Sequence, residues 1–309
     1  IDLGYAQIPQ EELEAFFRSV QLKRKYFRLK DGSFIDLTRD DPQLHSLRWM
    51  LDNDQEYSGS KLKFHKSTAM FLEKMLPRGS RLQRQEAYER LLQDLKHPEQ
   101  ASWEIPETVT ASLRPYQVVG YQWLKTLAHY GMGGILADDM GLGKTLQAIV
   151  YICSFPGQKT LIVCPTSLAY NWQDEFQKFA PSIRTCIVQG TPEEREELIA
   201  GRQGDYDVWI TTYPLIRKDT KSYQQQKYDH IFLDEAQFIK NPSSLGAKAV
   251  KSIPADNRFA LTGTPIENAL SELWSIFDFI MPGFFMKYSR FADAYEKPIL
   301  KEHDQNRMK

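Results

Sequence analysis

The chain has 309 residues, of which 42% are hydrophobic and 26% charged, enough apolar content for one sizeable domain and part of another. Its 39 Lys and Arg residues balance 40 Asp and Glu residues, so no global basic field indicates a nucleic-acid partner. It contains no apolar run of about 18 residues and no signal-like N-terminus, so neither a membrane partner nor export is predicted. Three cysteines lack metal-ligand spacing and are expected to be small core residues of a cytoplasmic protein: Cys153, Cys164 and Cys186.

Residues 1–100 carry no catalytic signature and are predicted to form a smaller, mostly helical α+β region. The first helix is predicted from apolar residues at helical spacing, Leu13, Phe16, Phe17 and Val20. A turn signal at 30–33 predicts a hairpin with strands at 25–29 and 34–37. Further helices are expected at 44–51, 62–76 and 82–95. Basic residues between Lys61 and Arg84 are interpreted as a solvated helix face, with a DNA contact as the alternative.

A polar stretch at 101–112 is predicted to link this region to residues 113–309. Beyond the linker, apolar segments alternate with helical segments, which predicts an α/β domain with a mostly parallel sheet covered on both faces. Strands are expected at 133–137, 160–164, 184–188, 207–212, 230–234 and 257–261. Functional loops in such sheets lie at the carboxyl ends of the strands. One edge of the sheet is therefore expected to hold the motifs described next.

The most informative motif is the glycine-rich stretch Asp-Asp-Met-Gly-Leu-Gly-Lys-Thr at 138–145. It lies between an apolar strand and a helical segment, the context that a phosphate loop requires. Its glycines would turn backbone N–H groups toward the phosphates of ATP, Lys144 would reach the outer two, and Thr145 would place its hydroxyl on Mg²⁺. The first position of the pattern is Asp138 instead of glycine, and an ordinary strand-to-helix turn is the alternative.

A second motif, Asp-Glu-Ala-Gln at 234–237, ends an apolar strand. In phosphoryl transfer one acid holds the metal shell and a neighbouring acid orients the attacking water, so Asp234 and Glu235 fit these two roles. A solvated loop after a strand is the alternative interpretation. A third element, Leu-Thr-Gly-Thr-Pro at 261–265, follows another apolar strand, and its hydroxyls are expected to sense the acidic pair. These motifs predict Lys144, Asp234 and Glu235 as the catalytic residues.

The motifs and their order resemble those of superfamily-two nucleic-acid translocases, and within them the SWI/SNF-type remodelling ATPases. In chain order, the matching blocks are Leu113–Gln117, the phosphate loop, Cys164–Leu168, Ile210–Tyr213, the acidic motif and Leu261–Asn268. This resemblance implies that residues 113–309 form a RecA-like P-loop domain, the first ATP-binding lobe of a helicase-like ATPase. The sequence departs from the family at Gln237, because most relatives carry His there.

The resemblance also implies the roles of individual residues. Gln117 would read the adenine edge of ATP. The residues expected to bind ATP are Gln117, Met140, Gly141, Leu142, Gly143, Lys144, Thr145 and Leu146, with Mg²⁺ on Thr145 and Asp234. Coupling between the site and the rest of the lobe is expected from Gln237, Thr262, Gly263 and Thr264.

The resemblance implies duplex DNA as the polymer. The absence of a run of basic residues is compatible with this, because hydroxyl and backbone N–H groups also contact phosphates. The positions expected to contact its backbone are Thr166, Ser167, Thr212, Tyr213, Arg217 and Lys240. Thr166 and Ser167 have an alternative role as caps of the following helix. Trp123 and Trp172 are expected in the core instead of serving as stacking platforms for bases.

In this family ATP lies between two RecA-like lobes, and its hydrolysis moves them along duplex DNA and displaces or remodels DNA-bound proteins. Only the first lobe is expected here, and the chain is interpreted as a fragment whose second lobe follows in cis. An arginine from that lobe would contribute about 10³ to 10⁵ in rate, so this chain alone is expected to hydrolyse ATP weakly. Residues 1–100 resemble a helicase-associated region of bacterial relatives, which suggests a cytoplasmic, nucleoid-associated bacterial protein. Two alternatives stay open: the same engine acting on RNA or an RNA polymerase complex, and a nucleotide-dependent binding module.

Overall fold

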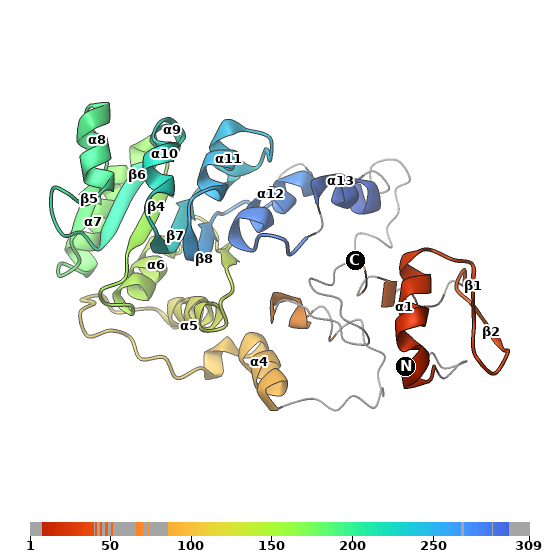
Figure 1. Ribbon diagram of the computed structural model, residues 1–309. Coiled ribbons are helices and arrows are strands. Elements are labelled where there is room, and N and C mark those ends of the chain that lie inside the picture. The colour runs from red at the N-terminus through yellow and green to blue at the C-terminus, as the bar shows by residue number, and fades with distance from the viewer. Residues whose placement is uncertain are drawn as a thin grey trace. The chain divides into compact units, whose positions relative to one another are not determined.

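The computed structural model describes residues 8–39, 41, 44, 47–48, 51, 66–70, 73, 86–266, 269–285 and 287–296. The chain divides into two compact units, Ile1–Leu92 and Gln93–Lys309 (Figure 1). The division falls within helix α4 (Glu86–Lys96), before the predicted linker. The helices predicted at 44–51 and 62–76 lie largely outside the described residues. Within the described ranges, no helix is both long and apolar enough to cross a membrane.

The N-terminal unit packs a helix against a β-hairpin. Its described elements are η1 (Gln10–Glu12), α1 (Leu13–Gln21), β1 (Tyr26–Arg28), β2 (Phe34–Asp36) and η2 (Lys66–Thr68). The two strands pair antiparallel with Phe27 opposite Ile35, and the predicted hairpin is confirmed. Both of these side chains are buried with the apolar face of α1 in one hydrophobic cluster. Side chains alternate across a strand, so the neighbours of Phe27 and Ile35 lie on the outer face of the hairpin.

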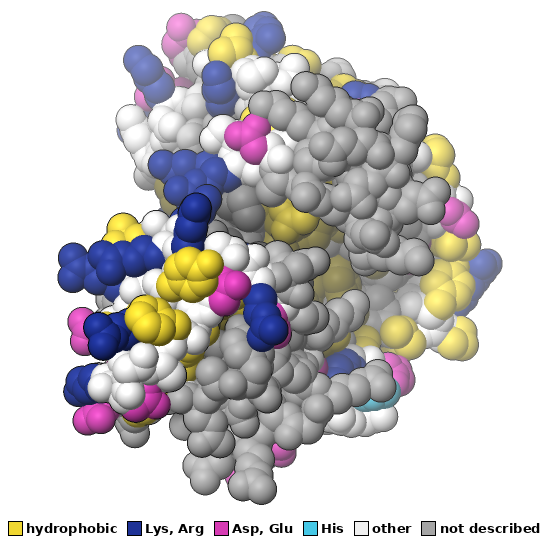
Figure 2. Space-filling model, turned by 90° about the vertical axis from the view of Figure 1, so that its right-hand side faces the viewer, with side chains coloured by type: hydrophobic (Ala, Val, Ile, Leu, Met, Phe, Trp, Pro, Cys, Tyr) yellow, Lys and Arg dark blue, Asp and Glu magenta, His cyan; other side chains and the backbone are white. Residues whose placement is uncertain are grey.

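Basic residues are concentrated in this helix and hairpin. Residues 18–34 contain six Lys or Arg residues and one Asp, although the whole chain has a formal charge of -1. Figure 2 shows one face of the molecule, on which Lys and Arg side chains (dark blue) lie among exposed hydrophobic side chains (yellow). Local charge therefore differs strongly from the average that the composition gives.

The second unit is built around a six-stranded parallel sheet, which confirms the predicted α/β fold class. Its strands lie in the order β3-β8-β7-β4-β6-β5. Every residue of the central strands β4 and β6 is buried, because helices cover both faces of the sheet. The strand bounds are β3 (Gly134–Leu136), β4 (Thr160–Cys164), β5 (Thr185–Ile187), β6 (Val208–Thr212), β7 (Tyr228–Asp234) and β8 (Ala255–Leu261).

Helices on the two sides of the sheet are visible in Figure 1. On one side, Ile216, Val250 and Ile276 come from three different helices and share a core cluster with the strands. On the other side, the Tyr151 ring packs edge-on against Phe232 and Phe259. The helices are η3 (Pro98–Gln100), α5 (Pro115–His129), α6 (Lys144–Cys153), η4 (Thr166–Leu168), α7 (Ala169–Phe179), α8 (Pro192–Ile199), α9 (Tyr213–Lys218), α10 (Thr220–Gln224), η5 (Ala236–Ile239), α11 (Leu245–Lys251), α12 (Leu270–Ile280), α13 (Tyr288–Phe291) and the π-helical turn η6 (Ala292–Glu296).

The predicted linker at 101–112 is packed onto the second unit. The Trp103 backbone N–H and indole N–H donate to the side chains of Gln122 and Thr126 on α5. The Tyr121 hydroxyl donates to the carbonyl of Glu104 at 2.7 Å. These bonds anchor the segment along α5.

All three cysteines are buried, as the sequence predicts. Burial raises the pKa of Cys153 and Cys186 to about 11, and the pKa of Cys164 to about 12 with a further contribution from Asp234. The thiolate form is therefore disfavoured at all three positions.

Candidate functional site

The glycine-rich loop between β3 and α6 has a backbone that only glycine adopts easily. Gly141 and Gly143 have φ angles of 84° and 77°, in the left-handed region. A Cβ atom on Gly143 would also lie 2.5 Å from the Gln117 amide nitrogen. Gly143 precedes the first turn of α6, where backbone N–H groups have no partner within the helix and can bind an anion. The loop thus has the local structure of a phosphate-binding turn.

Lys144 lies across this loop. Its ammonium group donates to the carbonyl oxygens of Asp138 at 2.6 Å and Asp139 at 3.1 Å. The positive charge is therefore held beside the N-terminus of α6, and Thr145 follows it in the first turn. Both residues begin α6 after the glycine-rich loop, and their contacts with ATP and Mg²⁺ stay predictions.

Asp138, which replaces the first glycine of the usual pattern, has a structural partner. Its carboxylate accepts a hydrogen bond from the Gln147 amide at 2.9 Å. Gln147 is fully buried, and Gly120 makes room for it, because a Cβ atom on Gly120 would lie 1.8 Å from the Gln147 amide oxygen. The departure from the pattern therefore ties the start of the loop to α6.

Gln117 connects α5 to the same loop. Its amide oxygen accepts from the Arg114 backbone N–H at 2.9 Å, and its amide nitrogen donates to the Leu142 carbonyl at 3.1 Å. The Tyr116 hydroxyl donates to that carbonyl as well, at 3.2 Å. Both ends of the Gln117 amide are thus engaged within the protein, and its contact with adenine stays a prediction.

Asp234 ends β7 with its side chain buried and fixed. The Trp172 indole N–H donates to one carboxylate oxygen at 2.8 Å, and the Glu235 backbone N–H donates to the other at 3.0 Å. The Tyr213 hydroxyl donates to the Asp234 carbonyl at 2.8 Å. Sequence reasoning expected Trp172 in the core and missed its bond to Asp234. The signal was a buried indole N–H, which needs an acceptor.

The electrostatics of Asp234 suit a cation ligand. Burial raises the pKa of this carboxyl above its usual value, and the Glu235 charge adds to the rise, while the Trp172 hydrogen bond and the Lys144 charge oppose it. A bound divalent cation would reverse this penalty on the charged form. Asp234 and Thr145 provide the hard oxygen atoms that Mg²⁺ prefers, so the donor chemistry fits this ion.

Glu235 begins a continuous chain of hydrogen bonds. Its backbone lies in the left-handed region, at φ 50° and ψ 58°, an uncommon conformation for a residue other than glycine. The Gln237 amide nitrogen donates to the Glu235 carboxylate at 2.7 Å, and the Gln237 amide oxygen accepts from the Thr262 hydroxyl at 2.9 Å. The Thr262 hydroxyl oxygen in turn accepts from the Thr264 backbone N–H at 3.0 Å.

Gly263 brings this chain of bonds next to the phosphate loop. A Cβ atom on Gly263 would lie 3.3 Å from the Met140 side chain and 4.0 Å from the Asp138 carbonyl oxygen. The backbone N–H of Thr262 donates to the Leu136 carbonyl at 3.2 Å, which continues the pairing of β8 with β3. The three motifs thus meet at the carboxyl edge of the sheet, as their positions after strands predict.

The residues predicted to contact nucleic acid differ in exposure. Thr166 and Ser167 are exposed after β4, and α7 is capped by Leu168 without a side-chain hydrogen bond, so their interpretation as helix caps is wrong. Thr212 and Tyr213 are buried. Arg217 is exposed on α9, and the Lys240 ammonium lies 3.7 Å from a Glu272 carboxylate oxygen.

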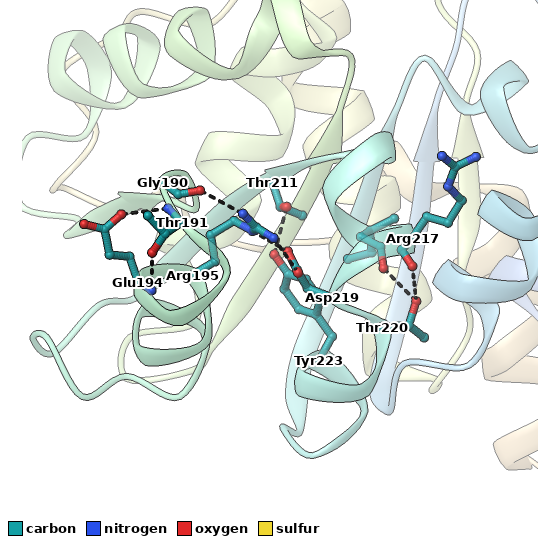
Figure 3. Close-up of polar contacts among 10 residues, drawn as sticks. Gly190, Thr191, Glu194, Arg195, Thr211, Arg217, Asp219, Thr220 and Tyr223 are labelled. Atoms are coloured by element: carbon teal, nitrogen blue, oxygen red, sulfur yellow. Dashed lines mark hydrogen bonds and ion pairs between the residues drawn. The ribbon is translucent and has the colours of Figure 1, made fainter.

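A buried ion pair fixes the end of α9, which carries Arg217 (Figure 3). The Arg195 guanidinium donates to both carboxylate oxygens of Asp219, at 2.6 and 2.8 Å, and also to the Gly190 carbonyl. The Thr220 hydroxyl donates to the Arg217 carbonyl at 3.1 Å. In Figure 3 the Arg217 side chain points away from the ion pair.

A parallel sheet with a phosphate loop, an acid pair and a hydroxyl-bearing third motif at one edge defines a RecA-like nucleotide-binding lobe. Residues 43–309 match the family described as SNF2-related domain, and the chain belongs to this family. The family match begins at residue 43, whereas the resemblance seen in the motifs begins only at Leu113.

Individual relatives agree with this assignment. The TATA-binding protein-associated factor MOT1 of Saccharomyces cerevisiae is 40% identical over 225 residues, which are 67% of this chain and 12% of that protein. An uncharacterized ATP-dependent helicase of Mycoplasma genitalium is 41% identical over 203 residues, 64% of this chain and 20% of that protein. The SWI2/SNF2 ATPase core of Sulfolobus solfataricus, solved in complex with dsDNA, superposes with a TM-score of 0.59 at 40% identity and covers 64% of this chain and 42% of that one. The chain thus spans less than half of each.

Proposed function

We propose that this chain is the ATP-binding lobe of a DNA-dependent ATPase that translocates on duplex DNA and displaces or remodels bound proteins. The observation that carries the proposal is the hydrogen-bonded path from Glu235 through Gln237 to Thr262, beside the phosphate loop. Through this path, a change at Glu235 during ATP binding or hydrolysis can reach Thr262 and the segment after β8. Membership in the SNF2-related family supports ATP as the nucleotide.

ATP binding uses the loop and the helix that follows it. The phosphates lie at the N-terminus of α6, where unpaired backbone N–H groups and the helix dipole favour negative charge. Lys144 exchanges its bonds to the Asp138 and Asp139 carbonyls for bonds to phosphate oxygens. This exchange costs little, because the ammonium keeps its number of acceptors and gains charged ones.

Mg²⁺ would be held by Thr145 and Asp234, and when bound it would neutralise charge on the phosphates. Glu235 orients the attacking water and accepts its proton, so its carboxylate must stay in one position. The Gln237 amide provides this restraint through its 2.7 Å bond.

Duplex DNA contacts the exposed residues Thr166, Ser167 and Arg217 and the partly exposed Lys240. The Sulfolobus solfataricus relative solved with dsDNA supports this polymer. Contacts of hydroxyl and basic groups with phosphates are largely independent of base sequence, and the affinity falls as salt rises. Thr212 and Tyr213 are buried, so their part in this proposal is to hold the segment after β6 in place, and the Tyr213 hydroxyl bonds it to the Asp234 carbonyl.

A second RecA-like lobe in cis would complete the site and supply an arginine to the γ-phosphate. Without it, the 309-residue chain binds ATP and hydrolyses it weakly. The protein that is moved is a DNA-bound protein, a class to which the TATA-binding protein in the MOT1 name belongs. A cytoplasmic, nucleoid-associated role in a bacterium is part of the same proposal.

The proposal is tested by comparing stimulants of ATP hydrolysis in the native protein that contains this chain. We expect duplex DNA to raise the rate more than single-stranded RNA of equal length. A larger effect of RNA, or of RNA polymerase, would instead favour an ATPase that acts on RNA or on an RNA polymerase complex. Translocation that persists after Glu235→Gln would mean that ATP acts as a conformational ligand, and would overturn the role of Glu235.

A further inference from the structure

The N-terminal unit has a groove that the ATPase account does not use. Residues of α1, the following turn and the hairpin line it, and its volume is about 460 Å³. The residues that define this arginine groove here are Arg18, Leu22, Arg24, Tyr26, Arg28 and Phe34. All six side chains are exposed.

The charge of the arginine groove is positive. Three arginines line it, and none of its lining residues is acidic. Among the described residues, neither Arg18 nor Arg24 has a carboxylate within ion-pair distance, and the Arg28 guanidinium lies 5.6 Å from the centre of the Phe34 ring. Asp36, on the outer face of the hairpin, is outside the groove and accepts hydrogen bonds from the backbone N–H and hydroxyl of Thr38. The groove is therefore complementary to an anion.

Two aromatic rings are presented on the same face of the hairpin. Tyr26 is 58% exposed and Phe34 is 66% exposed, although both flank residues that are buried in the core of the unit. Arg28 pairs directly with Phe34 across the two strands, and Tyr26 lies two positions before Arg28, on the same side of the sheet. Large exposed apolar side chains beside guanidinium groups that have no carboxylate partner in the described part of the chain indicate a binding surface instead of a solvated face.

We propose that the arginine groove binds single-stranded nucleic acid, with its arginines on the phosphates and with Tyr26 and Phe34 stacking on bases. Aromatic platforms inside a basic groove are the recurring means of binding unpaired strands without sequence preference. A duplex keeps its bases stacked on one another, so the two rings would gain nothing from it. An acidic polypeptide would satisfy the arginines but would leave the rings without partners. The site consists of residues other than those proposed to contact the duplex in the ATPase lobe.

Fluorescence anisotropy of the 309-residue chain with labelled oligo(dT) tests the proposal. An oligonucleotide of about 20 nucleotides is long enough to cover one groove of this kind. The double variant Tyr26→Ala with Phe34→Ala keeps every charge. We expect it to weaken oligo(dT) binding at least about thirtyfold, because each of the two stacked bases contributes about 1 kcal/mol or more. The ring-preserving variant Tyr26→Phe with Phe34→Tyr should bind as the parent does. Replacing Arg18, Arg24 and Arg28 by Gln should lower both the affinity and its dependence on salt.

Matched controls separate this groove from the ATPase lobe. Leu245 is 66% exposed on α11, so Leu245→Ala removes an equally exposed apolar side chain from the other unit and should leave oligo(dT) binding unchanged. Arg217→Gln should weaken duplex binding and leave oligo(dT) binding intact. The proposal for duplex contacts can therefore fail without affecting the proposal for the arginine groove. The inference is overturned if the aromatic double variant binds oligo(dT) as tightly as the parent. It is also overturned if that variant loses duplex binding by the same factor, or if polyglutamate displaces oligo(dT) at equal charge concentration.

Discussion

Gln237 joins Glu235 to Thr262 through the two ends of one amide group: its nitrogen donates to the carboxylate at 2.7 Å and its oxygen accepts from the hydroxyl at 2.9 Å. An amide can do this because it is a donor at one end and an acceptor at the other. Gln237 is thus the residue that connects the acidic motif to the third motif.

Gln237→Ala should lower the rate of ATP hydrolysis with little effect on the affinity for ATP. Removing the amide frees the Glu235 carboxylate to leave the position from which it acts on water, so we expect the DNA-stimulated kcat of the native protein to fall about tenfold to hundredfold. ATP affinity should change little, because Lys144 and the loop are untouched. Gln237→His, which retains a donor, should recover part of the rate, and Gln225→Ala on the exposed surface is the control. A loss of ATP affinity equal to the loss of kcat would contradict the coupling role.

Asp234→Asn should make the nucleotide-free chain more stable at pH 7 while it abolishes Mg²⁺-dependent hydrolysis. Burial raises the pKa of Asp234, so the folded protein holds this proton more tightly than the unfolded chain does. The resulting contribution to stability is complete below the ordinary Asp pKa and is lost as the pH rises through the raised value. Thermal unfolding at pH 4 and pH 7 measures it. A variant with a lower Tm than the parent at pH 7 would argue against a net cost of burying the charged Asp234 carboxylate.

His230 should make the fold sensitive to acid. Burial lowers the pKa of this imidazole from 6.5 to about 4, and its ring nitrogens contact the Tyr151 hydroxyl at 2.9 Å and the Gln158 amide oxygen at 2.6 Å. The unfolded chain therefore takes up the proton first, and stability present above pH 6.5 is lost as the pH falls toward 4. The loss from this group is about 3 kcal/mol, since each pKa unit corresponds to about 1.4 kcal/mol.

Urea unfolding from pH 7 to pH 4 isolates this contribution when the parent is compared with His230→Gln, which stays neutral throughout. The variant should lose less stability than the parent over this range. Equal pH dependence in the two proteins would show that the imidazole is already protonated in the folded state or is exposed to water.

The Arg195–Asp219 pair should stabilise the lobe and position Arg217. The two side chains are only 9% and 11% exposed, so Arg195→Gln leaves a carboxylate with few partners and should cost about 2 kcal/mol of unfolding free energy. Arg184 pairs with Asp207 but is 56% exposed, so Arg184→Gln should cost less than about 1 kcal/mol. Urea unfolding compares the two variants, and equal costs would contradict the difference in burial. Arg195→Gln should also weaken duplex DNA stimulation, whereas Arg184→Gln should not.

The strands and their loops were predictable because the residues that determine them are close together in the sequence. Apolar runs such as 160–164 are long enough to indicate buried strands, and the glycines at 141 and 143 are required by the turn that contains them. Partners that are far apart in the chain were not predictable. The bond between Trp172 and Asp234 joins residues on α7 and β7, and only the order of strands in the sheet brings them together. The interaction of Asp138 with Gln147 needed the space beside Gly120, which sequence patterns do not report.

The most direct test of the central claim is ATP hydrolysis by the native protein that contains this chain, measured with and without duplex DNA and beside Lys144→Ala. We predict strong stimulation by duplex DNA that the variant loses, because Lys144 is the charge that the loop holds for the phosphates. Hydrolysis that is the same with and without DNA would contradict a DNA-driven motor, and stimulated hydrolysis that survives in Lys144→Ala would contradict the assignment of the phosphate loop.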